Sequence, residues 1–266
     1  MWNRNPSVFW GGLLVIVGVL FLLANLNVLQ NVTWDVVWPV FLIALGVWLV
    51  AARIGPGGAS LDVDSSEPRE GLDKAKLEVA VGAGRLEVRA APLDDQLYRV
   101  HIEHGGARPE VRLDRASGTL RISQRLDWFM GARRLRIDVT LTDAIPWDVS
   151  CSTGAIRGDL DFSSAKLAGF TCRTGASTID LNLGTPAANV PIRIEGGALR
   201  VSIRRPAGVA VQVQASGAAV QLRADGNPRQ DGLGMRTWKS EGYDAAAARY
   251  DVTVSGGSLN VEVSGR

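Results

Sequence analysis

A short pattern repeats four times between Val149 and Leu222, and it constrains the fold more than any other feature of the chain. The copies are 21, 22 and 19 residues apart and are centred on Gly154, Gly175, Gly197 and Ser216. Self-similarity at a period of about 20 residues indicates stacked supersecondary units. The chain therefore has a repeating architecture over at least this part of its length.

Each copy has the same internal pattern of apolar residues. Taking the central residue as zero, apolar side chains fall at −5, −3, +2, +4 and +6, and the same template fits around Gly84 and Gly257. Alternation on both sides of a glycine indicates strand, bend and strand with one buried face, and we expect the glycine to adopt φ > 0 at the bend. One unit of this size cannot bury its own apolar face, so stacked units must share a core. We predict an all-β domain, a β-solenoid or a related layered β-fold, with repeats of about 20 residues.

The first 53 residues have a different composition. They hold five of the eight tryptophans but only three charged residues, Arg4, Asp35 and Arg53. The apolar runs 8–26 and 36–52 would form helices of roughly 28 and 25 Å, close to the thickness of a bilayer core. We predict a two-helix transmembrane hairpin over residues 1–53. The alternative, two buried helices of a soluble protein, leaves no polar outer face.

The charges next to these runs predict an orientation. Arg4 precedes the first run, Arg53 follows the second, and no Lys or Arg lies between them. The positive-inside rule then places both termini in the cytoplasm and residues 27–35 outside. Gly11 and Gly18 lie seven residues apart and would let a neighbouring helix approach closely, so they are candidate contacts for a membrane partner.

Two further segments stand apart from the repeats. Residues 54–74 are rich in Gly, Pro, Ser and acidic residues, which predicts a flexible linker before a folded domain over residues 75–266. Residues 225–249 interrupt the repeat, and we predict a capping loop whose aromatic residues cover the open end of the stack. The alternative is a docking loop for a partner, with Trp238 and Tyr243 as candidate contacts.

Two pairs of residues are candidate metal sites. His101 and His104 are three residues apart on a predicted strand and so point to opposite faces, and a site would need further ligands. We therefore expect surface histidines. Asp159 and Asp180 occupy the same position in neighbouring units and would suit a cation such as calcium, but we expect them to extend into water. The sequence thus predicts neither a metal nor a cofactor.

Cys151 and Cys172 occupy the same inward position in adjacent units. Strands about 4.8 Å apart place two Cα atoms within the range of a disulfide. The alternative is a pair of buried thiols that act as small apolar residues. The densest basic cluster, Arg133, Arg134 and Arg136, lacks the interleaved aromatic residues of a nucleic-acid surface, and the net charge is only +2. We predict no nucleic-acid partner.

Several segments resemble a known bacterial family. Residues 12–26, 34–40 and 45–48 resemble the paired helices of LiaI/LiaF-type membrane proteins. Residues 77–88 are similar to the opening of the toast-rack β-domain, and the segments Ile145–Val149 and Thr237–Tyr243 are similar to its continuation and to the C-terminal part of LiaF-like proteins.

This resemblance implies a location and a role. The location is the bacterial cytoplasmic membrane. The role is that of a regulator of the cell-envelope stress response, which modulates a sensor histidine kinase or an associated membrane protein without chemistry of its own. The family pattern supplies no catalytic residue.

Three classes of function are candidates for this chain. The first is a non-enzymatic interaction module, with the lipid bilayer, a membrane protein and a second copy of the chain as possible partners. The second is an adhesin-like structural β-solenoid displayed outside the membrane, which requires the opposite topology. The third is an enzyme that processes polysaccharides, which needs carboxylates that converge in a cleft. The acidic residues here are scattered over predicted solvated faces, so we expect no enzyme activity.

Overall fold

The computed structural model describes residues 42, 61–105, 107–124, 135–228 and 230–266. The chain divides into two compact units, Met1–Gly57 and Gly58–Arg266. The predicted helices 8–26 and 36–52, with Gly11 and Gly18, lie outside the described residues except for Leu42. Among the described residues, none forms a helix of the length and apolarity that crossing a membrane requires.

The described part of the second unit is built almost entirely of β-strands, which confirms the predicted all-β class. Its elements are β1 (Leu61–Pro68), β2 (Ala75–Ala91), β3 (Gln96–His104), β4 (Glu110–Asp114), β5 (Thr119–Ser123), β6 (Leu135–Thr142), β7 (Pro146–Phe162), β8 (Lys166–Leu183), β9 (Asn189–Arg205), β10 (Ala210–Ala224), β11 (Gln230–Lys239), the 3₁₀ helix η1 (Tyr243–Ala245) and β12 (Arg249–Gly265). They form one mixed sheet in the order β1-β3-β6-β2-β7-β8-β9-β12-β10-β11, with β5 between β2 and β4 beside this path.

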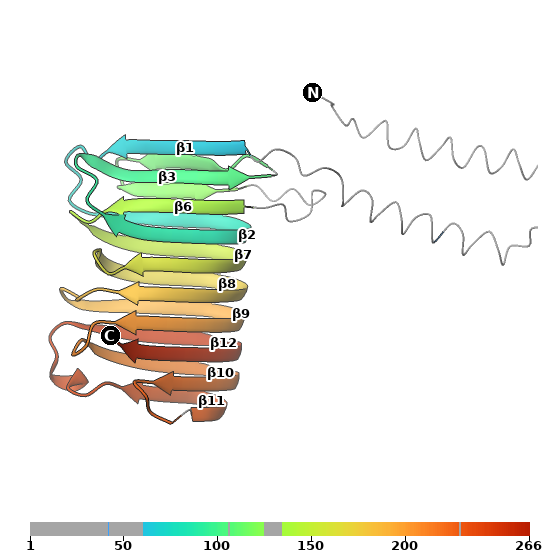
Figure 1. Cartoon of the computed structure of the whole chain (residues 1–266), viewed down its shortest axis with the longest axis vertical. Helices are drawn as coiled ribbons and strands as arrows, with labels where there is room; N and C mark the ends of the chain where they lie inside the picture. Colours follow the sequence, from blue (N-terminus) through green and yellow to red (C-terminus); the bar gives the residue numbers. More distant parts are fainter. Residues whose placement is uncertain (1–41, 43–60, 106, 125–134, 229) are drawn as a thin grey trace, which may run out of the picture. The chain divides into compact units, whose positions relative to one another are not determined.

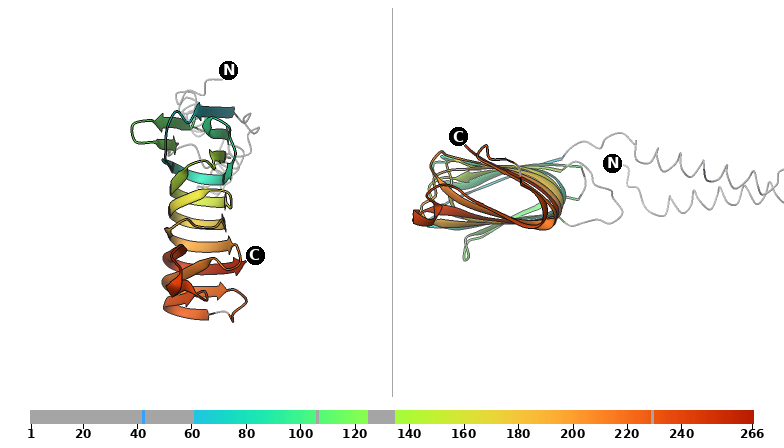
Figure 2. Two further views of the ribbon diagram at one scale, coloured as in Figure 1. Left: turned by 90° about the vertical axis from the view of Figure 1, so that its left-hand side faces the viewer. Right: turned by 90° about the horizontal axis from the view of Figure 1, so that it is seen from below.

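The long strands bend near their middle, so that their two arms enclose the core (Figure 2). β7, β8 and β9 are parallel neighbours, and the predicted inward position pairs Cys151 with Cys172 and Cys172 with Ile194. Residues on both arms of each strand, such as Ile192 and Val201 of β9, belong to one buried apolar cluster. The alternating pattern on either side of the bend therefore forms the two walls of a single core.

The pairing corrects the position of the bend in two copies. Val220 of β10 lies opposite Leu259 of β12, which lies opposite Leu199 of β9. The residue equivalent to Gly197 is therefore Ala218 and not Ser216. In β2 the equivalent residue is likewise Gly82 rather than Gly84, because Val81 pairs with Thr153. A shift of two residues keeps every side chain on the same face, so the period-two pattern alone could not detect it.

Close backbone stacking, and not positive φ, explains the glycines at the bends. None of Gly154, Gly175, Gly197 and Gly257 is among the described glycines with positive φ. A Cβ added to Gly175 would lie 2.6 Å from the carbonyl oxygen of Gly154, and one added to Gly154 would lie 2.7 Å from that of Gly82. The bends of β7 and β8 therefore rest directly on the backbone of the bend before them, and our expectation of φ > 0 was wrong.

The last strand is out of sequence order. β12 lies between β9 and β10 and is parallel to both, while β11 pairs with β10 in the antiparallel direction at the edge of the sheet (Figure 1). Stacking in simple sequence order would have placed β12 last.

The segment 225–249 contains a strand where we predicted a loop. β11 closes this end of the stack, and Trp238 packs against the core. The strand was missed because Gly232 and Gly234, with φ of 157° and 81°, interrupt its alternation. The guanidinium of Arg236 occupies the space over Gly232 and hydrogen-bonds to the carbonyl of Met235.

The predicted linker 54–74 is also partly folded. β1 pairs with β3 in the antiparallel direction, from Leu61 opposite His104 to Pro68 opposite Gln96. β1 is an edge strand with one neighbour, and such a strand tolerates charged residues and a proline. The segment therefore has the composition of a linker although it forms a strand. The folded unit therefore begins well before residue 75.

Candidate functional site

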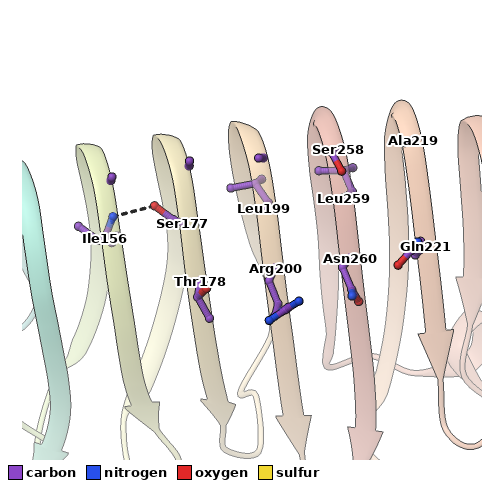
Figure 3. A pocket seen from close by; sticks show the side chains of 13 residues that line it. Ile156, Ser177, Thr178, Leu199, Arg200, Ala219, Gln221, Ser258, Leu259 and Asn260 are labelled. Carbon is purple, nitrogen blue, oxygen red and sulfur yellow. Dashed lines mark hydrogen bonds between the residues drawn. The ribbon is translucent and has the colours of Figure 1, made fainter.

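A groove on the β-domain follows the strand bends. Just past each bend, one exposed position carries a small side chain on five adjacent strands, in the order Ala155, Ala176, Ala198, Ser258 and Ala219. These residues line a groove of about 600 Å³ (Figure 3). Short side chains at this position leave space above the sheet that larger residues would fill.

Polar side chains form one wall of this groove. Thr178, Arg200, Asn260 and Gln221 line the groove at the next outward position (Figure 3). Arg157 of β7 occupies the same row, opposite Thr178, outside the residues that line the groove. Arg157 and Arg200 are exposed, and neither makes a hydrogen bond or ion pair with any other residue that the structure describes. One strand separates them, so their Cα atoms lie roughly 10 Å apart. The wall therefore presents the guanidinium group of Arg200, with that of Arg157 in the same row, and both are free to bind an anion.

The floor of the groove is firmly hydrogen-bonded. Ile156 and Leu199 are buried, and Ser177 takes the equivalent position in β8. The Ser177 hydroxyl accepts a hydrogen bond from the Ile156 amide at 2.9 Å and lies 2.5 Å from the Thr174 hydroxyl. The hydroxyl of the buried Ser177 is thus fully hydrogen-bonded, and the floor of the groove is a fixed surface.

Small, apolar and uncharged polar residues line the groove together with Arg200. Its lining contains no His, Cys, Asp or Glu, the residue types that most often serve as general acids, bases and metal ligands. Over the described ranges as a whole, no group of three or more such residues is placed to hold a metal ion. Guanidinium and amide groups next to small apolar side chains suit a polar or anionic chain.

The two histidines occupy different environments. His101 is 41% exposed, and its Nδ1 lies 2.8 Å from Oδ1 of Asp64 on β1. This hydrogen bond raises the pKa of His101 above its usual value. His104 is 2% exposed, so the prediction of a surface residue was wrong for it. An odd spacing along β3 places the two rings on opposite faces, and the face of His104 is the buried one.

The acidic pair and the basic cluster are placed as follows. Asp159 and Asp180 face each other on adjacent strands, as the repeat predicted. Arg136 forms ion pairs with Glu87 and Asp138 at 3.1 Å each, so its charge is already matched within the sheet. Arg133 and Arg134 lie outside the described residues.

Cys151 and Cys172 are free, buried and stacked in register. In-register side chains on parallel strands run side by side, so their Cβ atoms stay about 4.8 Å apart, whereas a disulfide needs roughly 3.5–4.5 Å. The hydrogen bond to Cys172, together with burial, holds the pKa of the Cys151 thiol well above its ordinary value. Of the two alternatives, the geometry favours buried thiols.

Trp238 and Tyr243, the aromatic residues predicted to contact a partner, both have structural roles. Trp238 packs against the core. Tyr243 is 7% exposed, donates its hydroxyl to Asp251, and has the cationic groups of Lys239 and Arg249 at 5.1 and 4.9 Å from its ring centroid. Burial of the Tyr243 ring leaves little surface for a partner, which argues against the predicted contact.

The groove itself was missed, although the sequence contains its signal. The apolar template counted inward positions only, and the alanine that follows Gly154, Gly175 and Gly197 was visible in each copy. An exposed small residue at a constant register position, next to Arg157 and Arg200, is the pattern that would have identified the groove.

The β-domain and the apolar N-terminal region together define a membrane-anchored protein of the LiaF-like class. Residues 8–50 match the LiaI-LiaF-like transmembrane region, and residues 57–204 match the N-terminal domain of toast_rack, DUF2154. The second match covers more than half of the chain, so the chain belongs to the toast_rack family. The transmembrane match indicates a membrane location.

Comparison with solved structures supports the fold. A crystal structure described as a "putative cell adhesion protein" from Clostridium sporogenes ATCC 15579 superposes with a TM-score of 0.67 at 20% sequence identity. The superposition covers 78% of this chain and 100% of the other. At this identity the likeness concerns the fold alone. A "putative adhesin" from Bacteroides fragilis NCTC 9343 aligns with a TM-score of only 0.22 at 7% identity, over 79% of this chain and 100% of its own, which supports no argument. A comparison with curated proteins gives no match.

Proposed function

We propose that this protein is a non-enzymatic regulator that binds a membrane protein partner and thereby modulates a cell-envelope stress-sensing system. The resemblance to LiaI/LiaF-type proteins suggests a sensor histidine kinase as the partner. The observation that carries the proposal is the groove along the bends, with the unpaired Arg200 in its wall and the unpaired Arg157 in the same row, in a chain with a LiaI-LiaF-like transmembrane region. Membrane anchoring would keep the groove close to cytoplasmic segments of other membrane proteins.

The groove fits an extended acidic segment of the partner. Its row of alanine and serine side chains leaves room for an extended polypeptide backbone. Guanidinium groups bind carboxylates through paired, charge-assisted hydrogen bonds. Because Arg157 and Arg200 form no ion pair or hydrogen bond with any described residue, a bound carboxylate would not have to displace a partner of either side chain.

Charge reversal tests this assignment. The double variant Arg157→Glu/Arg200→Glu should lose co-purification of a histidine kinase from native membranes in mild detergent. Arg193→Glu is the matched control, because Arg193 is also exposed on β9 but lies on the other arm of the strand. Equal recovery of the kinase with the double variant and the control would reject the groove as the binding site.

The proposed topology places both termini in the cytoplasm. A cysteine introduced at Thr33 should react with a membrane-impermeant maleimide on intact cells, and one introduced at Ser264 should react only after lysis. The native Cys151 and Cys172 are 2% and 0% exposed and contribute little background.

An adhesin-like protein with its β-domain outside the membrane is the second candidate. The description of the Clostridium sporogenes structure as a "putative cell adhesion protein" suggests this alternative, while the superposition itself concerns the fold alone. Labelling of the Ser264 cysteine on intact cells would select this alternative and remove the cytoplasmic partner.

A further inference from the structure

The polar row beside the groove has a regular spacing. It runs across adjacent strands in the order Arg157, Thr178, Arg200, Asn260 and Gln221. Neighbouring strands lie about 4.8 Å apart, so the two guanidinium groups, on β7 and β9, are two strand spacings or roughly 9.6 Å apart. Gln221 on β10 lies the same distance beyond Arg200. Every second strand of the row therefore carries a long polar side chain.

A ligand of this groove cannot bind as an additional strand. Each of β7, β8, β9, β12 and β10 has a hydrogen-bonded neighbour on both sides, so the backbone groups of these strands are already paired. The groove is lined by the same position on all five strands, and an elongated ligand must lie across them. Side chains must therefore recognise the ligand, at intervals set by the strand spacing.

The interval between the guanidinium groups matches one conformation of a bound peptide. A polyproline II helix has about three residues per turn and rises about 3.1 Å per residue, so every third side chain returns to the same face after about 9.3 Å. A β-strand returns to the same face after roughly 6.7 Å. An α-helix does so after about 5.4 Å, or after roughly 10.5 Å for a spacing of seven residues. Only the polyproline II repeat stays within about 1 Å of the row from Arg157 to Gln221, a length of roughly 19 Å.

The other side chains of the groove suit the same ligand. A polyproline II helix has no internal hydrogen bonds, so its carbonyl groups need external donors. Thr178 and Asn260 lie on the strands between those of Arg157, Arg200 and Gln221 and supply a hydroxyl and an amide (Figure 3). The row of alanine and serine side chains leaves space for proline rings.

A parallel row of acidic residues confines an acidic ligand to the groove. Asp159 and Asp180 face each other two residues beyond Arg157 and Thr178 along their strands. Their row is roughly 6.7 Å from the row of Arg157, on the side away from the alanines. An acidic chain is therefore attracted to the alanine side of the arginines and repelled from the opposite side.

We propose that the groove binds a proline-rich acidic segment in the polyproline II conformation, with two carboxylates three residues apart that pair with Arg157 and Arg200. This inference rests on the proposed function and specifies which kind of partner segment the groove accepts. Each guanidinium group forms paired, charge-assisted hydrogen bonds with one carboxylate. Proline holds the segment in its bound conformation beforehand, which lowers the entropic cost of binding.

Synthetic peptides test the spacing. Fluorescent peptides are titrated against full-length protein in mild detergent, and binding is followed by anisotropy. One proline-rich peptide has glutamate at every third position, and a second has the same composition with its glutamates adjacent to one another. A third is an alanine-rich helix with glutamate at every seventh position. We expect the first peptide to bind about tenfold more tightly than the others, because only its carboxylates reach both guanidinium groups.

Moving one guanidinium group by one strand provides the matched control. The variant Thr178→Arg/Arg200→Thr keeps the net charge but places the two guanidinium groups on adjacent strands, roughly 4.8 Å apart. It should lose the preference for glutamate at every third position, and Arg157→Glu/Arg200→Glu should bind none of the peptides.

Two results would overturn the inference. Equal or tighter binding of the second or third peptide by the unmodified protein would reject the polyproline II spacing but leave an acidic partner segment in place. Failure of all three peptides to bind would reject the inference as well. The co-purification of a histidine kinase, which uses no peptide, decides the proposed function separately.

Discussion

Adding a single methyl group at Gly175 tests the stacking of the bends. The Cβ of Gly175→Ala would lie 2.6 Å from the carbonyl oxygen of Gly154, whereas real Cβ atoms stay at least 3.0 Å from such an atom. The contact is with backbone, so no side chain can rotate away. β8 must therefore move relative to β7 at the point where both strands bend.

The expected cost follows from this displacement. Overpacking that forces a backbone shift typically costs about 1–3 kcal/mol. For a domain of this size, each kcal/mol lowers the melting temperature by roughly 2–4 °C. We expect Gly175→Ala to lower the melting temperature of the β-domain by roughly 2–12 °C. Hydrogen exchange should become faster in β8 first.

Gly158→Ala is the matched control. Gly158 lies in the neighbouring strand, and the atoms nearest to an added Cβ are 3.7–4.0 Å away, which is ordinary contact. Restricting the unfolded chain should then stabilise this variant by about 0.4–1 kcal/mol. Both variants are melted as full-length protein in mild detergent and followed by hydrogen-exchange mass spectrometry. Equal or higher stability of Gly175→Ala relative to Gly158→Ala would refute the stacked-bend explanation.

Three further predictions concern single contacts. Asp64→Asn should lower the pKa of His101 in an NMR titration. Because the pKa of His101 is raised in the folded state, the stabilisation of β1 by this hydrogen bond is fully present below the unfolded pKa of about 6.5. This stabilisation is lost as the pH rises through the folded pKa. An unchanged His101 titration would contradict it. Asp225→Ala should destabilise the domain by about 3 kcal/mol in thermal unfolding, because it leaves the 5% exposed Arg205 without its ion-pair partner. Trp147→Phe should cost about 1–3 kcal/mol in the same assay, because the fully buried indole N–H donates a 2.9 Å hydrogen bond to a backbone carbonyl.

Most of the repeat was predictable from sequence because period-two alternation reports directly on burial. Ile192, Val201 and their equivalents were assigned to the core from the pattern alone, and the structure confirms them. The positions of the bends in β2 and β10 were not predictable in this way. A two-residue shift leaves the alternation unchanged, and only strand pairing reveals that Ala218 is the equivalent of Gly197.

Strand order and edge strands escaped prediction for a different reason. β12 carries the same pattern as its neighbours, so nothing local specifies that it lies between β9 and β10. β1 and β11 are edge strands with one neighbour each, and an edge tolerates the charges, proline and glycines that otherwise indicate loops. The groove was not predicted because its small residues point outward, whereas the sequence template included inward positions only.

The most direct test of the proposed function places a photo-crosslinking amino acid in the groove. Ala155 lines the groove, and Ser152 is an exposed residue of the same strand on the other side of its bend. Irradiation of living cells should link the probe at position 155, but not at 152, to a sensor histidine kinase, and Arg157→Glu/Arg200→Glu should abolish the link. Equal adducts from both positions, or adducts that persist in the charge-reversed variant, would contradict the account.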